Sequence, residues 1–232
     1  MGSEAAKHFS MTSLIAHRIA LIRQQLPASV RLIAVTKQVP VAAMREAYNA
    51  GIRDFGESRI QEATTKQQQL QDLPDITWHL IGSLQSNKAK KALELFQWIH
   101  SLDSLKLAQR LDHLAQELSC QPQVCLQVKL LSDPNKSGWT VPSLLADLPS
   151  LNQCRHLHIR GLMSIPPLGL TASEILNFFE QTRELADKIR QQNFSHIQMQ
   201  ELSMGMSEDY HLAVQAGATM IRLGRTLFGE RL

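Results

Sequence analysis

The chain has 232 residues, a length common for a single α/β barrel, and its 44% hydrophobic and 19% charged residues are typical of a folded globular protein rather than a disordered one. Basic residues exceed acidic ones by only three charges, and aromatic residues make up 5%. No basic run with interleaved aromatics occurs, so nucleic acid is not expected as a partner.

Cysteine usage and hydropathy indicate a cytoplasmic location. The three cysteines are Cys120, Cys125 and Cys154. They form neither a C-x-x-C pair nor an even set, which argues against zinc and disulfides and favours small buried thiols in a reducing compartment. No stretch reaches the roughly 18 apolar residues of a spanning helix, so no membrane partner is expected. Residues 1–11 are interpreted as a polar leader ahead of a native start at Met11, with residues 12–232 as one domain.

From residue 31 onward, short apolar runs alternate with amphipathic segments, a rhythm typical of βα repetition. The first run, 32–35, has no polar break and stops at Thr36 and Lys37. Eight such runs predict eight strands of a parallel sheet. The predicted strands are 31–37, 53–57, 77–83, 97–102, 123–130, 157–164, 199–204 and 219–224.

Helical spacing fills the segments between these strands. The clearest apolar stripe is Leu107, Leu111, Leu114, Ala115 and Leu118. The sequence TASE at 171–174 is a capping box that predicts the start of another helix. Eight βα units within a single-domain length predict a single closed (β/α)8 TIM barrel rather than an open doubly wound sheet. Residues 225–232 leave room for only a short last helix, so an extra N-terminal helix over 11–26 is expected to cover that side.

Active sites of such barrels lie at the carboxyl ends of the strands, which selects Lys37. A lysine in a largely apolar barrel mouth loses hydration, and this favours the uncharged amine that attacks carbonyl groups. From position alone, a lysine that extends from the rim into water is an equally good interpretation. His156 and His158 fall at the amino-terminal start of the sixth strand, so no metal site is predicted there.

The loops after the last two strands suggest a phosphate site. They read LSMGMSED and RLGRT, and each contains a glycine, Gly205 or Gly224, that lets the backbone approach an anion. Hydroxyl groups accompany them at Ser203, Ser207 and Thr226. In barrels this is the usual place for a phosphate, so a phosphorylated ligand is favoured.

Closure of the barrel would bring Lys37 next to these loops, a gap that pyridoxal phosphate (PLP) could span. Its aldehyde would meet the amine, its phosphate would occupy the loops, and Arg222 on the eighth strand could hydrogen-bond the pyridine nitrogen. Because an arginine stays charged, it disfavours protonation of that nitrogen and weakens the ring as an electron sink. Transaminase-type chemistry is therefore disfavoured.

Eight ordered segments, covering about residues 12–230, resemble the pyridoxal phosphate homeostasis protein family, whose fold is similar to the barrel domain of alanine racemase. The segments are AVTK, FGES, WHLIGSLQSNKAK, IHSLDS, KSGW, IRGLMSIPP, ELSMGMSEDY and RLGRTLFG. The resemblance implies Lys37 as the Schiff-base lysine, Met163 close to the cofactor ring and Arg222 at the pyridine nitrogen. The residues it implies for the phosphate loops are Ser203, Met204, Gly205, Gly224 and Arg225.

Two positions depart from the family pattern. Ser58 stands where asparagine is usual, and Lys129 stands where asparagine is frequent after the fifth strand. Lys129 adds a second amine near the barrel mouth. Lys129 and Lys136 are the two further lysines considered for covalent attachment.

A racemase of this type needs a second acid/base opposite the lysine, which in alanine racemase comes from an additional domain and a partner subunit. The two tyrosines, Tyr48 and Tyr210, are not at strand ends. Tyr210, near the GMSED loop, is considered as a base, but packing or a hydrogen bond at the rim is the favoured interpretation. No catalytic residue is therefore assigned.

The resemblance thus implies a monomeric carrier of PLP in vitamin B6 homeostasis and in amino- and keto-acid balance, without robust catalysis. Transient contact with PLP-dependent enzymes is the expected protein interaction. A PLP-dependent amino acid racemase or lyase is the alternative. A Schiff-base aldolase of sugar phosphates, which would use the same amine and loops without a cofactor, is a third possibility. Lys88, Lys90 and Lys91 are interpreted as a solvated helix face in preference to a transfer surface.

Overall fold

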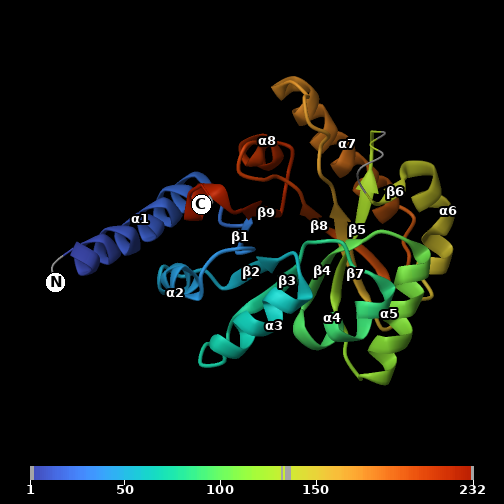
Figure 1. The fold of residues 1–232 in the computed structure, drawn as a ribbon. Coiled ribbons are helices and arrows are strands. Elements are labelled where there is room, and N and C mark those ends of the chain that lie inside the picture. Colours follow the sequence, from blue (N-terminus) through green and yellow to red (C-terminus); the bar gives the residue numbers. More distant parts are fainter. Residues whose placement is uncertain (1–2, 132, 134–136, 231–232) are drawn as a thin grey trace.

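The computed structural model describes residues 3–131, 133 and 137–230, with side chains from residue 14 onward (Figure 1). Eight parallel strands form a ring in the order β4, β3, β2, β1, β9, β8, β7 and β5, which closes because β4 also pairs with β5. Their bounds are β1 Arg31–Val35, β2 Asp54–Glu57, β3 Thr77–Leu80, β4 Trp98–Leu102, β5 Gln123–Lys129, β7 His158–Met163, β8 Ile197–Ser203 and β9 Met220–Leu223. The predicted (β/α)8 barrel is confirmed, with each strand within a few residues of its expected position.

One strand was not predicted. The two-residue β6, Trp139–Thr140, pairs with the end of β5 outside the ring. The buried Trp139 indole donates a hydrogen bond to Asp147 Oδ2 at 2.8 Å, which holds the segment against the following helix. Two residues are too few to produce a periodic signal in the sequence.

Helices lie outside the ring of strands and connect them (Figure 1). The connecting and terminal helices are α2 Val41–Asn49, α3 Ile60–Gln69, α4 Ala89–Leu95, α5 Leu105–Glu117, α6 Val141–Leu151, α7 Ala172–Arg190, α8 Tyr210–Gln215 and α9 Arg225–Phe228, and a 3-10 turn, η1 Ser86–Lys88, precedes α4. The predicted capping box is present: the Thr171 hydroxyl accepts from Glu174 N, and the Glu174 carboxylate accepts from Thr171 N. The four-residue α9 confirms the expectation of a short last helix.

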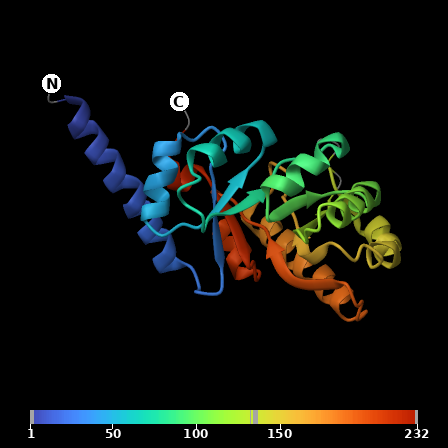
Figure 2. The same ribbon diagram turned by 90° about the horizontal axis from the view of Figure 1, so that it is seen from below.

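The N-terminal helix α1, Ser3–Gln25, packs against α2 and α9 through Ile15, Ile19 and Ile22, which are buried. It therefore covers the side of the barrel that the short α9 leaves open. Both ribbon views show its first turns extending away from the barrel (Figures 1 and 2). Within the described part of the chain, no helix combines the length and apolar character needed to cross a bilayer.

Strand residues alternate between two cores, as the pleat requires. In β1, Leu32 and Ala34 join the large core between barrel and helices, whereas Ile33 joins a small cluster inside the ring. The inner cluster consists of Ile33, Trp98, Cys125, Met163 and Met220. This cluster occupies part of the interior of the ring.

A substitution at Gly161 in β7 tests the tight pairing of β7 with β8. A Cβ at this position would lie 1.7 Å from the carbonyl oxygen of Glu201. We expect Gly161→Ala to lower the free energy of unfolding in urea by about 2–3 kcal/mol, because the strands would have to separate. The control is Gly169→Ala, where no atom lies within 4 Å but φ is +85°; its cost should be near 1 kcal/mol. Equal losses would contradict the tight pairing.

Candidate functional site

A cavity of about 510 Å³ opens at the carboxyl ends of the strands, within the range typical of small-molecule sites. Its walls come from the carboxyl ends of six different strands, or the residues that follow them, and from residue 230. The lining residues are Val35, Lys37, Ser58, Ile81, Ile165, Met206, Arg222, Gly224, Arg225 and Glu230. The barrel therefore brings together residues almost 200 positions apart in the sequence, with one amine, two guanidinium groups and one carboxylate at a single mouth.

Four of the eight residues predicted to bind a cofactor line this cavity: Lys37, Arg222, Gly224 and Arg225. The other four lie beneath or beside it, and their roles stay predictions. Ser203 is fully buried and contacts Arg222, and Met163 belongs to the cluster inside the ring. Met204 packs in the outer core. Gly205 accepts a hydrogen bond from Arg222 N at 3.0 Å.

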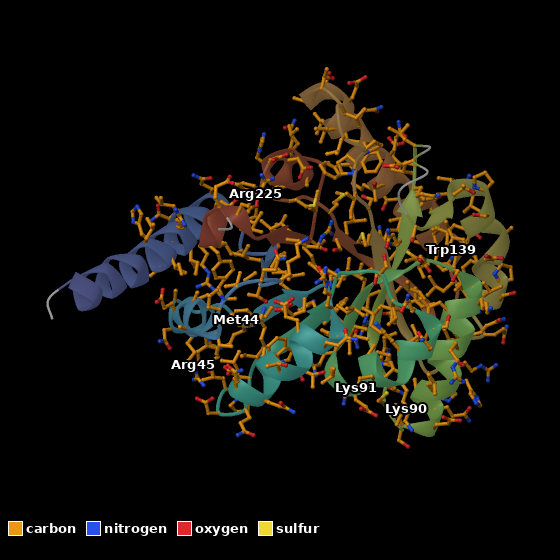
Figure 3. The ribbon with its side chains drawn as sticks, in the orientation of Figure 1. Met44, Arg45, Lys90, Lys91, Trp139 and Arg225 are labelled. Atoms are coloured by element: carbon orange, nitrogen blue, oxygen red, sulfur yellow. The ribbon has the colours of Figure 1, made fainter. Side chains whose placement is uncertain are left out.

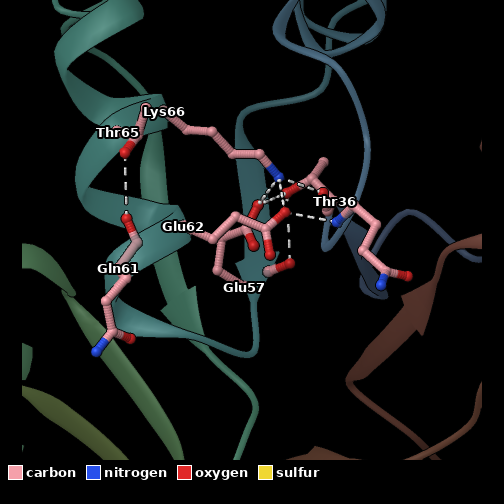
Figure 4. A network of polar contacts seen from close by, with 8 residues as sticks. Thr36, Glu57, Gln61, Glu62, Thr65 and Lys66 are labelled. Carbon is pink, nitrogen blue, oxygen red and sulfur yellow. Dashed lines mark hydrogen bonds and ion pairs between the residues drawn. The ribbon is translucent and has the colours of Figure 1, made fainter.

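The backbone beneath Lys37 is held by a buried ammonium group. Lys66 of α3 donates to the Thr36 carbonyl at 2.5 Å, to Glu57 Oε1 at 2.8 Å and to Glu62 Oε1 at 2.6 Å (Figure 4). Thr36 Oγ1 also donates to Glu57 Oε1 at 2.6 Å. Burial raises the pKa of Glu57, and the hydrogen bonds from Lys66 and Thr36 oppose this shift. The polar network therefore fixes the residue immediately before Lys37.

The residue after Lys37 is held by the same network. Gln38 N donates to Glu62 Oε1 at 2.5 Å, and Gln38 has φ +60°, a left-handed conformation that is unfavourable for a residue with a side chain. Burial raises the pKa of Glu62, but the bonds from Lys66 and Gln38 outweigh it, and the net shift is downward. Both neighbours of Lys37 are thus anchored, which fixes the backbone from which its side chain starts.

Arg222 forms the floor of the cavity. Its Nη1 donates to the carbonyl oxygen and to Oγ of Ser203, both at 2.6 Å, and its Nη2 donates to the Ser164 carbonyl at 3.2 Å. Burial lowers the pKa of Arg222 to about 10, while the nearby Asp209 carboxylate opposes the shift. The guanidinium therefore stays positively charged at neutral pH.

The two predicted phosphate loops lie side by side. Thr226 N donates to Ser207 Oγ at 3.3 Å, and Arg225 pairs with Glu208, so each loop contacts the other. Figure 3 places Arg225 at the start of α9, on the side of α1. Gly205 has φ +93°, and a Cβ there would lie 2.6 Å from Ala213 Cβ. This glycine is thus required for the turn and for close packing of α8.

Several predicted alternatives lie elsewhere. Tyr210 donates to Gln25 Oε1 at 3.0 Å, at the exposed surface of α8 and α1, and it is not among the described residues that line the cavity. Lys129 ends β5 and is not among them either. Ser58 does line the cavity. Lys136 lies outside the described residues.

The remaining surface predictions concern histidines and lysines. His158 begins β7 and shares a hydrogen bond with Gln121 at 2.9 Å, and His156 Nδ1 is 3.4 Å from Asp112. Among the described residues, no group of three or more His, Cys, Asp or Glu side chains could hold a metal ion. Lys90 and Lys91 are exposed on α4 at the periphery (Figure 3).

Sequence reasoning missed the polar residues that support the site. Lys66 lies in a polar helical segment whose sequence is typical of an exposed helix face. Met206 belongs to no sequence pattern that indicates a binding role. His79 and His100 are fully buried in β3 and β4, where they interrupt otherwise apolar strands. A polar residue at an inward position of a buried strand was the signal that could have revealed the two histidines.

The structure agrees with comparisons to known proteins. Residues 12–232 match the family described as alanine racemase, N-terminal domain. Alanine racemase of Clostridium difficile 630 shares the fold at a TM-score of 0.72 and 14% identity, over 94% of this chain and 57% of the racemase chain. The fold and the lysine at the end of β1 define a barrel of the alanine racemase N-terminal class.

Closer relatives specify the family. The pyridoxal phosphate homeostasis protein of Synechocystis is 55% identical over 89% of this chain and 94% of its own length, and that of Escherichia coli K12 is 34% identical over 94% and 97%. The chain belongs to the pyridoxal phosphate homeostasis protein family. PipY of Synechococcus elongatus PCC7942, solved with PLP bound, matches 93% of this chain and all of its own at a TM-score of 0.89 and 58% identity.

The buried ion pair under Lys37 gives a stability prediction. We expect Lys66→Met to lower the free energy of unfolding by about 3–5 kcal/mol, because Glu57 would remain buried without its cation. Removing that carboxylate as well, in Lys66→Met with Glu57→Gln, should recover part of the loss. The control is Lys91→Met, whose exposed pair with Glu94 at 3.0 Å should contribute below about 0.5 kcal/mol. Urea unfolding measures all three; similar small losses for both lysines would contradict the network.

The two buried histidines give a pH prediction. Burial lowers the pKa of His79 below its ordinary 6.5 and that of His100 well below it. The unfolded chain therefore binds protons below about pH 6.5 that the folded chain does not, and stability should decrease as the pH falls, by up to about 1.4 kcal/mol per pH unit for each histidine. His100→Gln should reduce this slope by up to half. Urea unfolding between pH 7.5 and pH 5 measures it, and an unchanged slope would contradict the neutral state of His100.

Proposed function

We propose that this protein binds PLP in the cavity at the carboxyl ends of the strands and holds it covalently, as a Schiff base on Lys37. The observation that carries the proposal is the convergence of Lys37, Arg222, Gly224 and Arg225 on one cavity of about 510 Å³. The PLP-bound structure of the relative PipY, 58% identical, supports it. When bound, PLP supplies an aldehyde that reacts with amines and a ring that can accept electrons.

Each end of the cofactor has a matching partner in the chain. The Lys37 amine meets the aldehyde, and its anchored neighbours Thr36 and Gln38 fix where the side chain starts. The phosphate fits beside Gly224 and Arg225, where main-chain N–H groups at the start of α9 and the Arg225 side chain offer hydrogen bonds and positive charge. Arg222 faces the pyridine nitrogen.

The predicted supporting residues act on this arrangement from below. Ser203 binds Arg222 through two acceptor atoms. Gly205 and Met204 set the path of the loop, since Gly205 accepts from Arg222 N and Met204 anchors the loop in the outer core. Met163 lies in the inner cluster against which Ile165, a cavity residue, packs.

We further propose a role in PLP homeostasis and amino- and keto-acid balance rather than in robust catalysis. The positive charge of Arg222 disfavours a protonated pyridine ring, which limits carbanion chemistry. The described cavity residues include no tyrosine or histidine to act as a second acid/base. We also propose a monomer in the cytoplasm, with transient contacts to PLP-dependent enzymes; the three cysteines, all free thiols, agree with a reducing compartment.

Lys37→Ala tests covalent binding. The wild-type protein mixed with PLP should develop a visible absorption band, and after borohydride reduction mass spectrometry should locate the added mass on the peptide that contains Lys37. Lys37→Ala should lose both the band and the added mass, because no other lysine lines the described cavity. Lys129→Ala, at the end of β5 but outside the cavity, is the matched control and should retain both. A colourless wild-type protein, or attachment at another lysine, would refute the assignment.

The absence of robust catalysis is tested by incubating the PLP-loaded protein with single enantiomers of amino acids. We expect racemisation and lyase rates no higher than those of the same concentration of PLP without protein, because the site lacks a second acid/base. Chiral chromatography measures racemisation, and ammonia or keto-acid release measures lyase activity. Sustained turnover that disappears in Lys37→Ala would establish an enzyme instead of a carrier.

A further inference from the structure

A chain of hydrogen bonds crosses the interior of the barrel and ends at Arg222. Asp54 Oδ1 and His79 Nε2 are 2.9 Å apart, and His79 Nδ1 and His100 Nε2 are also 2.9 Å apart. His100 Nδ1 lies 2.7 Å from Ser203 Oγ, to which Arg222 Nη1 donates at 2.6 Å. The step from His100 to Ser203 joins β4 to β8, residues 103 positions apart, so the chain spans the ring. We call these five residues the relay.

With both imidazoles neutral, proton counting gives the relay a single direction. Arg222 can only donate, and the Asp54 carboxylate can only accept. If Arg222 donates to Ser203, the Ser203 hydroxyl can donate to His100 Nδ1. His100 then donates from Nε2 to His79 Nδ1, and His79 donates from Nε2 to Asp54. Every link is satisfied when both imidazoles are neutral and carry their proton on Nε2, and no link requires a charged histidine.

The surroundings shield four of the five relay residues from solvent, and only the Asp54 side chain is partly exposed. His79 and His100 are fully buried, and the Trp98 ring stacks on His79 with centroids 5.8 Å apart and planes at 14°. Arg31 Cζ lies 5.2 Å from the centroid of the Trp98 ring, and Arg31 Nε lies 3.9 Å from Asp54 Oδ1. The positive charge of Arg31 acts on both histidines, and the Asp209 carboxylate acts on Arg222. Apolar residues form the rest of the inner cluster. A chain of polar groups in such a place costs free energy unless each group is bonded.

We propose that His100 is a positioning residue for Arg222: through Ser203 it fixes the guanidinium group that faces the ligand cavity. Two N–H groups of Nη1 and one of Nη2 are used inside the barrel. The guanidinium carries five N–H groups, so two have no acceptor among the described residues and are available to a ligand in the cavity that Arg222 lines. The identity of that ligand, PLP bound through its pyridine nitrogen, rests on the proposed function. The positioning of Arg222 by His100 does not.

A purely structural alternative is that the two histidines merely fill space beside Trp98. In that case any side chain of similar size at position 100 would serve equally well. The relay instead requires a donor and an acceptor at this position, with the donor toward His79 and the acceptor toward Ser203. His100→Gln retains both groups at a similar separation, whereas His100→Met retains the volume and loses both.

The first experiment needs no cofactor. Nitrogen-15 NMR of the protein without PLP, at pH 7, should show His79 and His100 as neutral rings protonated on Nε2. It should also show separate, slowly exchanging Nη signals of Arg222. These Nη signals should persist in His100→Gln and should merge or exchange rapidly in His100→Met. Ser203→Ala should have the same effect as His100→Met and replaces it if His100→Met does not fold. Charged or Nδ1-protonated histidines, or unchanged Arg222 signals in all variants, would overturn the relay.

The second experiment measures the consequence for the ligand. PLP affinity, titrated through the absorption of PLP, should fall about tenfold in His100→Met and in Ser203→Ala, because the hydrogen bonds that hold the charged Arg222 are lost. It should fall less than about threefold in His100→Gln, because these hydrogen bonds are kept. The control is His158→Gln at the far end of β7, with no change expected. Equal loss in Gln and Met would support space filling instead. Failure of the wild-type protein to bind PLP would refute the proposed function, whereas the NMR result would still decide the relay.

Discussion

The site depends on one buried ammonium group. Lys66 places its charge beneath the first strand, where it binds the Thr36 carbonyl and the Glu57 and Glu62 carboxylates within 2.8 Å. A charge in such a place requires these partners, and the partners in turn require the charge. Because Thr36 and Gln38 are both tied to this network, the intervening Lys37 has little freedom at its backbone. The protein therefore sets the point from which the Lys37 side chain starts, at the wall of the cavity.

Closure of the barrel supplies the rest of the site. β1 pairs with β9, and Ile33 of β1 lies opposite Arg222. The strand that ends near Lys37 is thus the direct neighbour of the strand that carries the guanidinium, and the loop after β9 begins at Gly224. In an open sheet with β1 and β9 at its edges these groups would lie far apart. Parallel strands in a ring place all their carboxyl ends at one mouth, which is why such barrels concentrate function there.

Much of this could be predicted from the sequence. The period of the apolar runs predicts the eight strands, and the known location of barrel sites selects Lys37, Arg222, Gly224 and Arg225 as candidates. The strands are confirmed because they depend on local pattern, and the four residues line one cavity because the rule holds for the whole fold class. Their roles toward a cofactor stay predictions. The capping box at Thr171 is confirmed for the same reason as the strands, since its four residues interact with one another.

The rest depends on contacts between distant residues. Nothing around Lys66 distinguishes it from an exposed helix lysine, because its partner Glu57 lies on another element and its burial follows from the packing of α3. The link between His100 and Ser203 joins opposite sides of the ring, so only the closed barrel reveals it. Met163 illustrates a limit of a different kind: its strand was correctly predicted, yet its side chain belongs to the inner cluster beneath the cavity walls.

The direction of Lys37 toward the cavity is the claim on which the account rests, and a crystal structure of this chain grown with PLP tests it most directly. We expect continuous electron density from Lys37 Nζ into the ligand, with the phosphate beside Gly224 and Arg225 and the ring nitrogen within hydrogen-bond distance of Arg222. A structure in which Lys37 points into bulk water, or in which the ligand occupies the opposite mouth of the barrel, would contradict it.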